Sequence, residues 1–366
     1  MSDFKARRNQ LRACLQADDA DAMLVTNTTN VSYLTGFTGD DSFLLVTSGA
    51  DLLLSDPRYE QQIGEECPGL DTFIREPGEL IWDVTCRELA KLQIGVLVVE
   101  SKSLSVASFD HLASEAQVGE LRKASVSVEA LREIKDESEI AALRRAIAIA
   151  ERVFVSVRAQ MTSSQTEREI ANELERQIRV LGGSGCSFKP IVAVGPRAAL
   201  PHATPGQSRI GDAPFVLIDW GATFDGYRSD LTRVLATSKI PAKFAEVYQA
   251  VLAAQTAAIE AMKPGVLVSE IDAIAREVIA AAGMGEQFNH GLGHGIGLDI
   301  HEAPRLGKNQ DRPLQPGMVV TVEPGVYYPG WGGVRIEDDC LITADGCEVL
   351  SSLPRDIASN CVELLL

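Results

Sequence analysis

Two short stretches far apart in the sequence constrain the fold of this chain most strongly: residues 216–233 (VLIDWGATFDGYRSDLTR) and 318–338 (MVVTVEPGVYYPGWGGVRIED). Each reads as an apolar strand, a turn containing glycine and aromatic residues, and a second strand, which is the pattern of a β-hairpin. Each hairpin also carries two acidic residues placed to meet across it. The sequence therefore predicts a β-sheet with two pairs of carboxylates on it.

In the first stretch, Asp219 and Asp230 lie equally far from a point between Phe224 and Asp225. We therefore expect the two aspartates to be direct cross-strand partners on one face, with Cβ atoms roughly 4.5–5.5 Å apart. Like charges facing each other destabilise a sheet, so this arrangement favours a cation between the two carboxylates.

In the second stretch, Glu323 and Glu337 are equally far from Gly330, which puts both on one face if the strands pair without a bulge. His294, in the glycine-rich run HGLGHGIGLDIHE, completes the set. Four carboxylates and one imidazole suit Mn²⁺, Co²⁺, Zn²⁺ or Fe²⁺ better than Cu⁺. With this many carboxylates, two ions roughly 3.5–4 Å apart are expected rather than one.

The chain resembles the pita-bread metallopeptidases, and within them the Xaa-Pro aminopeptidase and Xaa-Pro dipeptidase (prolidase) group. The motifs that carry the resemblance are SFKPIVAVGPRAALPHATP, SDLTR, HGLGHGIGLDIHE, VEPGVYY and GGVRIED. They surround the ordered metal ligands Asp219, Asp230, His294, Glu323 and Glu337. The N-terminal third is similar to a creatinase-type N-terminal domain, in MLVTNTTNVSYLTGFTG and DPRYEQQ.

This resemblance implies an α/β (α+β) fold in two domains. Residues 1–126 would form the creatinase-like α/β N-terminal domain, and residues 127–366 the pita-bread catalytic domain, a curved antiparallel sheet covered by helices. It also implies two divalent metal ions, Mn²⁺ first, with Co²⁺ or Zn²⁺ as alternatives. A homodimer is a further expectation.

The resemblance also assigns roles to particular residues. Glu323 would bind metal and carry a proton from the attacking water to the leaving nitrogen, and His301 would hydrogen-bond the scissile carbonyl oxygen. Other cleft or supporting positions are His202, His290, Arg335 and Tyr327. Arg305 would meet either a substrate carboxylate or a surface acid, and the sequence leaves that choice open.

Several residues of the same types carry a plainer interpretation. His111, in a predicted helix of the N-terminal domain, reads as an ordinary structural histidine. We expect turn or supporting roles, rather than metal ligation, for Asp225, Asp299, Asp338 and Asp339.

Composition narrows the class of partner. The chain has 366 residues and a formal net charge of −17, which argues against nucleic acid, because binding there is largely phosphate neutralisation by Lys and Arg. No apolar run approaches the ~20 residues that span a bilayer. The charged N-terminus and the seven scattered cysteines, without a CxxC motif, indicate a cytoplasmic protein with reduced thiols.

The periodicity of apolar residues predicts helices alternating with strands in the first domain. The turn at 47–51 is a hairpin signal, which indicates that the sheet is mixed instead of all parallel. Strands are expected at 22–26, 43–47, 51–55 and 94–100. Helices are expected there at 3–17, 57–66, 78–92 and 106–115. In the second domain helices are expected at 136–160, 164–181, 241–262 and 268–282, the first of them against the sheet.

Hydrolysis of the bond between an N-terminal residue and proline, by an Xaa-Pro aminopeptidase, is the first expectation, and an Xaa-Pro dipeptidase is the alternative. The substrates would be small peptides with proline at the second position. Methionine aminopeptidases share the five ligands but usually lack the N-terminal domain. A metal-free creatinase-like amidinohydrolase and a non-catalytic peptide-binding module are disfavoured, because all five ligands are present.

Overall fold

The computed structural model describes residues 3–125 and 127–365, and it divides into two compact units. The first unit ends at Arg132 and the second begins at Glu133. The predicted domain boundary at residue 126 lies outside the described residues. In the part of the chain that is described, no helix is long and apolar enough to cross a membrane.

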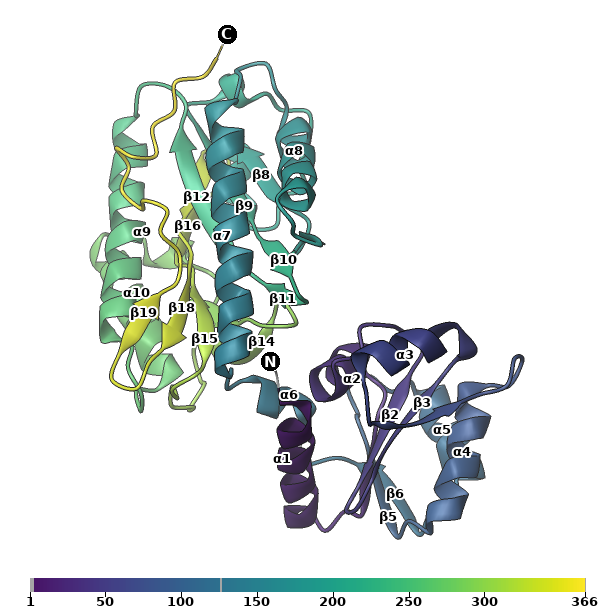
Figure 1. Ribbon diagram of the computed structural model, residues 1–366. Helices are drawn as coiled ribbons and strands as arrows, with labels where there is room; N and C mark the ends of the chain where they lie inside the picture. Colours follow the sequence, from purple (N-terminus) through teal and green to yellow (C-terminus); the bar gives the residue numbers. More distant parts are fainter. Residues whose placement is uncertain (1–2, 126, 366) are drawn as a thin grey trace. The chain divides into compact units, whose positions relative to one another are not determined.

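The first unit is built on a mixed sheet with the strand order β4-β3-β2-β1-β5-β6 (Figure 1). Strands β1, β2 and β3 pair antiparallel, whereas β3–β4, β1–β5 and β5–β6 pair parallel. The predicted mixed sheet is therefore confirmed. In this order, the strands span Asp71–Ile74, Asp51–Ser55, Phe43–Thr47, Ala22–Val25, Val96–Val99 and Glu120–Lys123.

Helices cover this sheet because its central strands are apolar on both faces. The core on one face joins β1 and β5 to Leu89 of α4 and Leu112 of α5, and α1 packs against α2 and β2. The helices are α1 (Phe4–Ala17), α2 (Thr28–Thr35), α3 (Glu60–Glu66), α4 (Ile81–Leu92), α5 (Val106–Glu115) and α6 (Val128–Arg132). Helices α2 and α6 and the short strands β4 and β6 were not predicted from the sequence.

The second unit opens with α7 (Glu137–Ala159), which begins at a capping box formed by Asp136 and Glu139. Its predicted apolar stripe is buried against the sheet. Phe154 stacks on Trp220 with ring centroids 4.3 Å apart, and the indole N–H of Trp220 donates to the carbonyl of Ala150 at 3.0 Å. The helix is thereby fixed to strand β9 (Phe215–Trp220).

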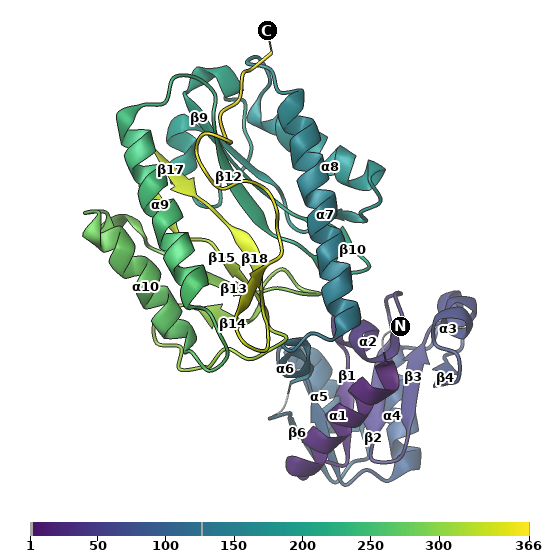
Figure 2. The same cartoon turned by 60° about the vertical axis from the view of Figure 1, so that its left-hand side comes forward.

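Strand β9 is buried on both faces, and its alternate residues enter two separate cores. Val216, Ile218 and Trp220 pack with α7 and α8 (Glu167–Val180), whereas Phe215 and Leu217 pack with α9 (Ala242–Ala261) and α10 (Val268–Ala281). Figures 1 and 2 both show the strands of this unit between these two pairs of helices.

The strands of the second unit form several small sheets. One has the order β12-β9-β8, a second β14-β13-β15-β18-β19, and a third is the pair β16-β17. An isolated bridge between Thr232 and Glu337 joins β12 to the segment between β17 and β18. The remaining strands are β7 (Gly185–Cys186), β8 (Ile191–Val194), β10 (Ala222–Phe224), β11 (Tyr227–Arg228), β12 (Leu231–Ala236), β13 (Gly293–Gly295), β14 (Glu302–Leu306), β15 (Val319–Val322), β16 (Gly325–Tyr328), β17 (Gly332–Arg335), β18 (Asp338–Ile342) and β19 (Cys347–Val349).

Candidate metal centre and catalytic site

The first acid-bearing hairpin forms, but its register differs from the prediction. Asp219 pairs with Thr232, so the expected direct pairing of Asp219 with Asp230 is wrong. The turn consists of Asp225 and Gly226, both with positive φ, as a two-residue type I′ turn requires. This turn lies one residue later than the midpoint assumed from the sequence. Asp230 still faces the same side as Asp219, as its diagonal neighbour.

The second hairpin has the predicted register. Strand β15 pairs with β18 up to Val322 and Asp338, and β16 pairs with β17 from Gly325 and Arg335 onwards. Both sets of pairs are centred on Gly330. Glu323 and Glu337 therefore face each other across the hairpin, as expected.

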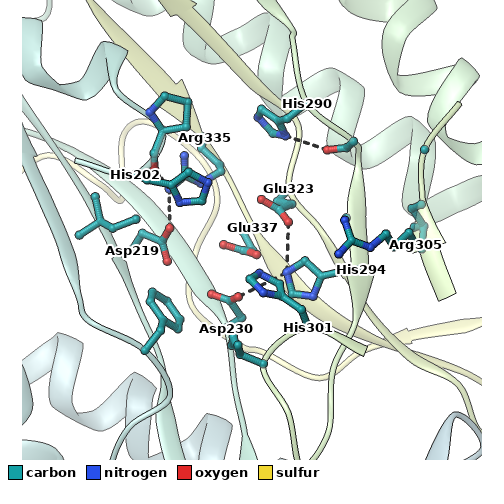
Figure 3. A pocket seen from close by; sticks show the side chains of 18 of the residues that line it. His202, Asp219, Asp230, His290, His294, His301, Arg305, Glu323, Arg335 and Glu337 are labelled. Carbon is teal, nitrogen blue, oxygen red and sulfur yellow. Dashed lines mark hydrogen bonds and ion pairs between the residues drawn. The ribbon is translucent and has the colours of Figure 1, made fainter. Parts of the chain in front are cut away.

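The two hairpins and strand β13 bring five candidate ligands to one cleft of about 990 Å³ (Figure 3). Ligand atoms of Asp230, His294 and Glu337 all lie within 4.8 Å of one another. Nε2 of His294 is 3.4 Å from Oε1 of Glu323 and 3.7 Å from Oδ2 of Asp230. Asp219 lines the same cleft.

The electrostatics of this cluster fit a bound cation. Within the described part of the chain, one buried oxygen each of Asp219, Asp230 and Glu337 has no hydrogen-bond partner. Burial, and then repulsion by neighbouring acids, raises the pKa of Asp230 and Glu337 well above the usual range. Burial also raises the pKa of Glu323 to about 7. Unpaired buried carboxylates are costly, and divalent ions offset that cost.

His294 presents the correct ring atom to such an ion. Its Nδ1 lies 3.0 Å from the carbonyl of Gly295, which fixes the proton on Nδ1 and leaves the Nε2 lone pair facing the carboxylates. Burial lowers the pKa of His294 to about 4, so the ring is neutral near pH 7. A neutral imidazole is the form that binds metal.

Arg335 holds the candidate metal ligand Asp219 against the cleft wall. Its Nη2 donates to Oδ2 of Asp219, its Nη1 donates to the hydroxyl of Tyr327 at 2.8 Å, and its Nε donates to Thr232 at 3.2 Å. The Tyr327 hydroxyl also lies 3.0 Å from Nε2 of His290. The sequence-predicted Arg335, Tyr327 and His290 therefore form one hydrogen-bonded chain that ends on a candidate ligand.

The remaining predicted site residues line the same cleft. His202, His301 and Arg305 all border it and are exposed to it. The ring of His301 stands edge-on to that of His294, with centroids 4.5 Å apart. Burial, and then the charge of Arg305, lowers the pKa of His301, so its neutral form is favoured.

The comparison with known families agrees with this geometry. Residues 141–344 match metallopeptidase family M24, and residues 7–134 match the Creatinase/Prolidase N-terminal domain. The chain belongs to metallopeptidase family M24. The predicted resemblance to the pita-bread metallopeptidases is thereby confirmed.

Several named relatives and solved structures resemble the chain over nearly its whole length. An Xaa-Pro dipeptidase of Pyrococcus horikoshii is 35% identical, covering 94% of this chain and 96% of its own. The solved structure of an Xaa-Pro dipeptidase from Bacillus anthracis has a TM-score of 0.93 at 36% identity, covering 99% and 100%. An X-Pro aminopeptidase from Thermotoga maritima has a TM-score of 0.88 at 35% identity, covering 96% and 100%.

Two threonines of the candidate site were not predicted from the sequence. Thr232 donates to Oε2 of Glu337 at 2.6 Å. Thr321 donates to Oε1 of Glu323 at 3.3 Å and accepts the backbone N–H of His294 at 3.1 Å. The sequence spacing could have indicated both threonines. Thr232 follows Asp230 by two residues and Thr321 precedes Glu323 by two, so each threonine lies on the same face of its strand as a candidate ligand.

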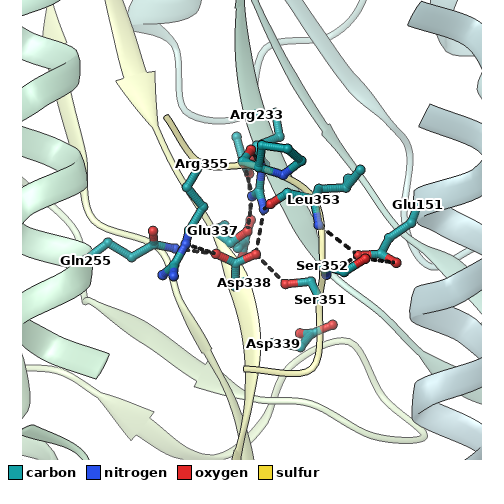
Figure 4. Close-up of polar contacts among 12 residues, drawn as sticks. Glu151, Arg233, Gln255, Glu337, Asp338, Asp339, Ser351, Ser352, Leu353 and Arg355 are labelled. Atoms are coloured by element: carbon teal, nitrogen blue, oxygen red, sulfur yellow. Dashed lines mark hydrogen bonds and ion pairs between the residues drawn. The ribbon is translucent and has the colours of Figure 1, made fainter. Parts of the chain in front are cut away.

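Behind the candidate ligands lies a buried network centred on Asp338 (Figure 4). Arg233 and Asp338 are both fully buried and form an ion pair of 2.7 Å. Gln255 donates to the other oxygen of Asp338 at 2.9 Å, and the hydroxyl of Ser351 also donates to Asp338. Nη1 of Arg233 donates to the carbonyl of Glu337 at 2.7 Å. The network therefore fixes the backbone of a candidate ligand from the side away from the cleft.

The neighbouring acid, Asp339, accepts the backbone N–H of Asp230 at 3.0 Å. This hydrogen bond joins the second hairpin to the first and holds the backbone of Asp230, another candidate ligand. Asp338 and Asp339 make these supporting contacts and Asp225 lies in the turn, as expected from the sequence.

Proposed function

We propose that this M24 metallopeptidase is an Xaa-Pro dipeptidase that hydrolyses the bond between the first residue and a C-terminal proline. Aminopeptidase activity was the first expectation from the sequence, but the similar proteins favour the dipeptidase alternative. The Pyrococcus horikoshii relative and the Bacillus anthracis structure are both named Xaa-Pro dipeptidases.

One feature of the cleft supports the dipeptidase most directly. Arg305 lines the cleft, and no described residue forms an ion pair or a side-chain hydrogen bond with it. Its charge is close enough to lower the pKa of both His294 and His301. A guanidinium matches a carboxylate in geometry and charge. A dipeptide carries its free carboxylate on the proline itself, next to the scissile bond, whereas a longer peptide carries an uncharged amide there.

The proposal includes two divalent ions, with Mn²⁺ expected first and Co²⁺ or Zn²⁺ as alternatives. Asp219, Asp230, His294, Glu323 and Glu337 would hold them. When bound, such ions supply an activated water and polarise the scissile carbonyl.

The protein's own groups have complementary roles in this proposal. Glu323 would take the proton of the attacking water and release it to the leaving nitrogen of proline. Neutral His301 donates an N–H to the carbonyl oxygen as charge develops there. His202 and His290 border the bound peptide, and Arg335 holds Asp219 in place.

A homodimer and a cytoplasmic location, both expected from the sequence, also belong to this proposal. Sedimentation equilibrium of the purified protein would test the dimer, and a monomeric mass would contradict it.

The decisive experiment compares Ala-Pro, Ala-Pro-Ala and Ala-Ala as substrates of metal-stripped protein titrated with Mn²⁺, Co²⁺ or Zn²⁺. We expect the highest kcat/KM with Ala-Pro, little hydrolysis of Ala-Ala, and no activity without metal. Preference for Ala-Pro-Ala would favour the aminopeptidase. Activity in the presence of a chelator, or silence on all three peptides with metal bound, would contradict the proposal.

A further inference from the structure

A buried ion pair lies directly beside the proposed oxygen-binding histidine. Nζ of Lys135 is 3.1 Å from Oε2 of Glu302, and the two side chains are only 1% and 4% exposed. Glu302 immediately follows His301 in the sequence, whereas Lys135 comes from the segment that precedes α7. An ion pair at this depth is costly to form and still more costly to break on one side only.

The carboxylate of Glu302 also contacts the backbone of the loop that precedes it, residues 297–301. Its Oε1 accepts the backbone N–H of Asp299 at 3.0 Å. Gly297 passes so close that a Cβ there would lie 2.7 Å from Oε2 of Glu302. The carboxylate therefore fills the inside of the loop, while His301 borders the cleft.

The same carboxylate residue is coupled to the candidate ligand His294. Glu302 pairs with Gly295 across strands β13 and β14, and the register shifts between His294 and Gly295. The two imidazoles meet edge-on, with centroids 4.5 Å apart. A displacement of Glu302 would therefore move its neighbour His301, and then the ring of His294 that His301 contacts.

Lys135 is held in place by its own backbone. Its N–H donates to the carbonyl of Gly317 at 2.9 Å, in the turn that leads into β15. Gly317 has a positive φ of 89°, and a Cβ there would lie 3.2 Å from the carbonyl oxygen of Lys135, so the packing is tight. The backbone of Lys135 is thus held in place, and its ammonium group fixes the position of Glu302 in the 297–302 loop.

From these contacts we propose that Lys135 is a positioning residue, which holds His301 in the orientation for binding the scissile carbonyl oxygen by anchoring Glu302. The inference rests on the proposed function. Without the cation, the buried Glu302 carboxylate would lose its ion pair with Lys135, and residues 297–302 would shift with it. A displacement of 1 Å at a reacting group can cost roughly 10²-fold in rate.

The test is a double-mutant cycle with Lys135→Met and His301→Ala, measured as kcat/KM on Ala-Pro with metal-saturated protein. We expect Lys135→Met to lower kcat/KM by about 10²-fold, and to have almost no further effect in the His301→Ala background. A purely stabilising role would instead make the two losses multiply, and that result would overturn the inference, as would full activity of Lys135→Met.

The matched control is Arg144→Met, which breaks the exposed ion pair between Arg144 and Glu348 in the same unit. This variant should keep wild-type activity. If Lys135→Met does not fold, Lys135→Gln, which removes the charge but keeps a polar group beside Glu302, takes its place in the same cycle with the same expected non-additivity.

A readout independent of catalysis separates this inference from the proposed function. The His301 ring Cε1–H resonance, assigned by its loss in His301→Ala, should shift in metal-free Lys135→Met and stay in place in Arg144→Met. An unchanged resonance would overturn the positioning role even in an active enzyme. An inactive wild-type protein would overturn the proposed function, while this resonance still decides the role of Lys135.

Discussion

The hydroxyl of Thr232 donates a hydrogen bond of 2.6 Å to Oε2 of Glu337, and both residues are buried. The other carboxylate oxygen of Glu337 has no hydrogen-bond partner in the described structure. The threonine therefore fixes the orientation of the carboxylate through one oxygen and leaves the second oxygen available to a cation.

Replacing Thr232 by valine keeps the shape of the side chain but removes this donor. We expect metal affinity to fall about 10-fold, the lower end of the range for groups that orient metal ligands. Calorimetric titration of Mn²⁺ into metal-free protein would measure it. Thr256→Val, which removes a hydroxyl bonded only within helix α9, is the control and should bind metal normally. Equal affinity of Thr232→Val and wild type would contradict the role.

Asp230→Ala or Glu337→Ala should abolish peptidase activity and weaken metal binding, because each removes a carboxylate from the cluster around His294. The fold should persist, since the lost group is one of several mutually repelling buried acids. Metal content by mass spectrometry and circular dichroism would check both statements. Asp225→Asn, in the hairpin turn, is the matched control, because asparagine tolerates its positive φ. Full activity in either ligand variant would refute the assignment.

The metal-free protein should lose stability as the pH rises from 6.5 to 8. An acid whose pKa is raised on folding stabilises the fold at low pH, and that stability is lost as the pH rises through the folded value. This holds for Glu323, with a pKa of about 7, and for Asp230 and Glu337. His290 and His294, with pKa values lowered to about 4, act with the opposite sign, but below pH 6.5.

Differential scanning calorimetry in the presence of a chelator should therefore give a Tm several degrees lower at pH 8 than at pH 6.5. Saturation with Mn²⁺ should remove this dependence, because the ion replaces the protons on the carboxylates. A Tm that rises with pH in the chelated protein would show that the acids are not mutually destabilising.

The parts of the site that sequence could predict depend on local pattern. The two hairpins were recognisable because strand alternation and turn residues act over about 20 residues. In the first hairpin the turn was placed one residue too early, which shifted the expected partner of Asp219 by two residues, from Thr232 to Asp230. Symmetry between Asp219 and Asp230 had been taken as the guide instead of the Asp225–Gly226 turn. Turn chemistry sets hairpin register more reliably than a chosen pair of side chains does.

The parts that sequence could not supply depend on tertiary contacts. The pair of Lys135 and Glu302 joins residues 167 positions apart, and neither residue lies in a motif that implies the other. Helix α2 was missed because its sequence, TTNVSYLT, is rich in residues with low helix propensity. Its Asn27 cap and its end at Gly36, with φ of 84°, show how end signals define a helix of weak propensity.

His301→Ala should lower kcat by roughly 10²–10³, the loss expected for one hydrogen-bond donor to a developing oxyanion. Metal content should not change, because His301 borders the cleft beside His294 and is not part of the ligand cluster. Steady-state kinetics and metal analysis on the same preparation would measure both. Loss of metal in this variant would instead identify His301 as a ligand.

Arg305→Met should weaken recognition of the substrate carboxylate while leaving the chemistry of the site intact. We expect KM for Ala-Pro to rise at least 10-fold, since a charge-assisted hydrogen bond contributes about 1.5–3 kcal/mol. The blocked substrate Ala-Pro-amide, which has no carboxylate, should be hydrolysed equally by wild type and variant. Lys243→Met, a cation that stands over Tyr328 and does not line the cleft, is the control. An equal loss on both substrates would mean that Arg305 acts on the histidines instead of on the substrate carboxylate.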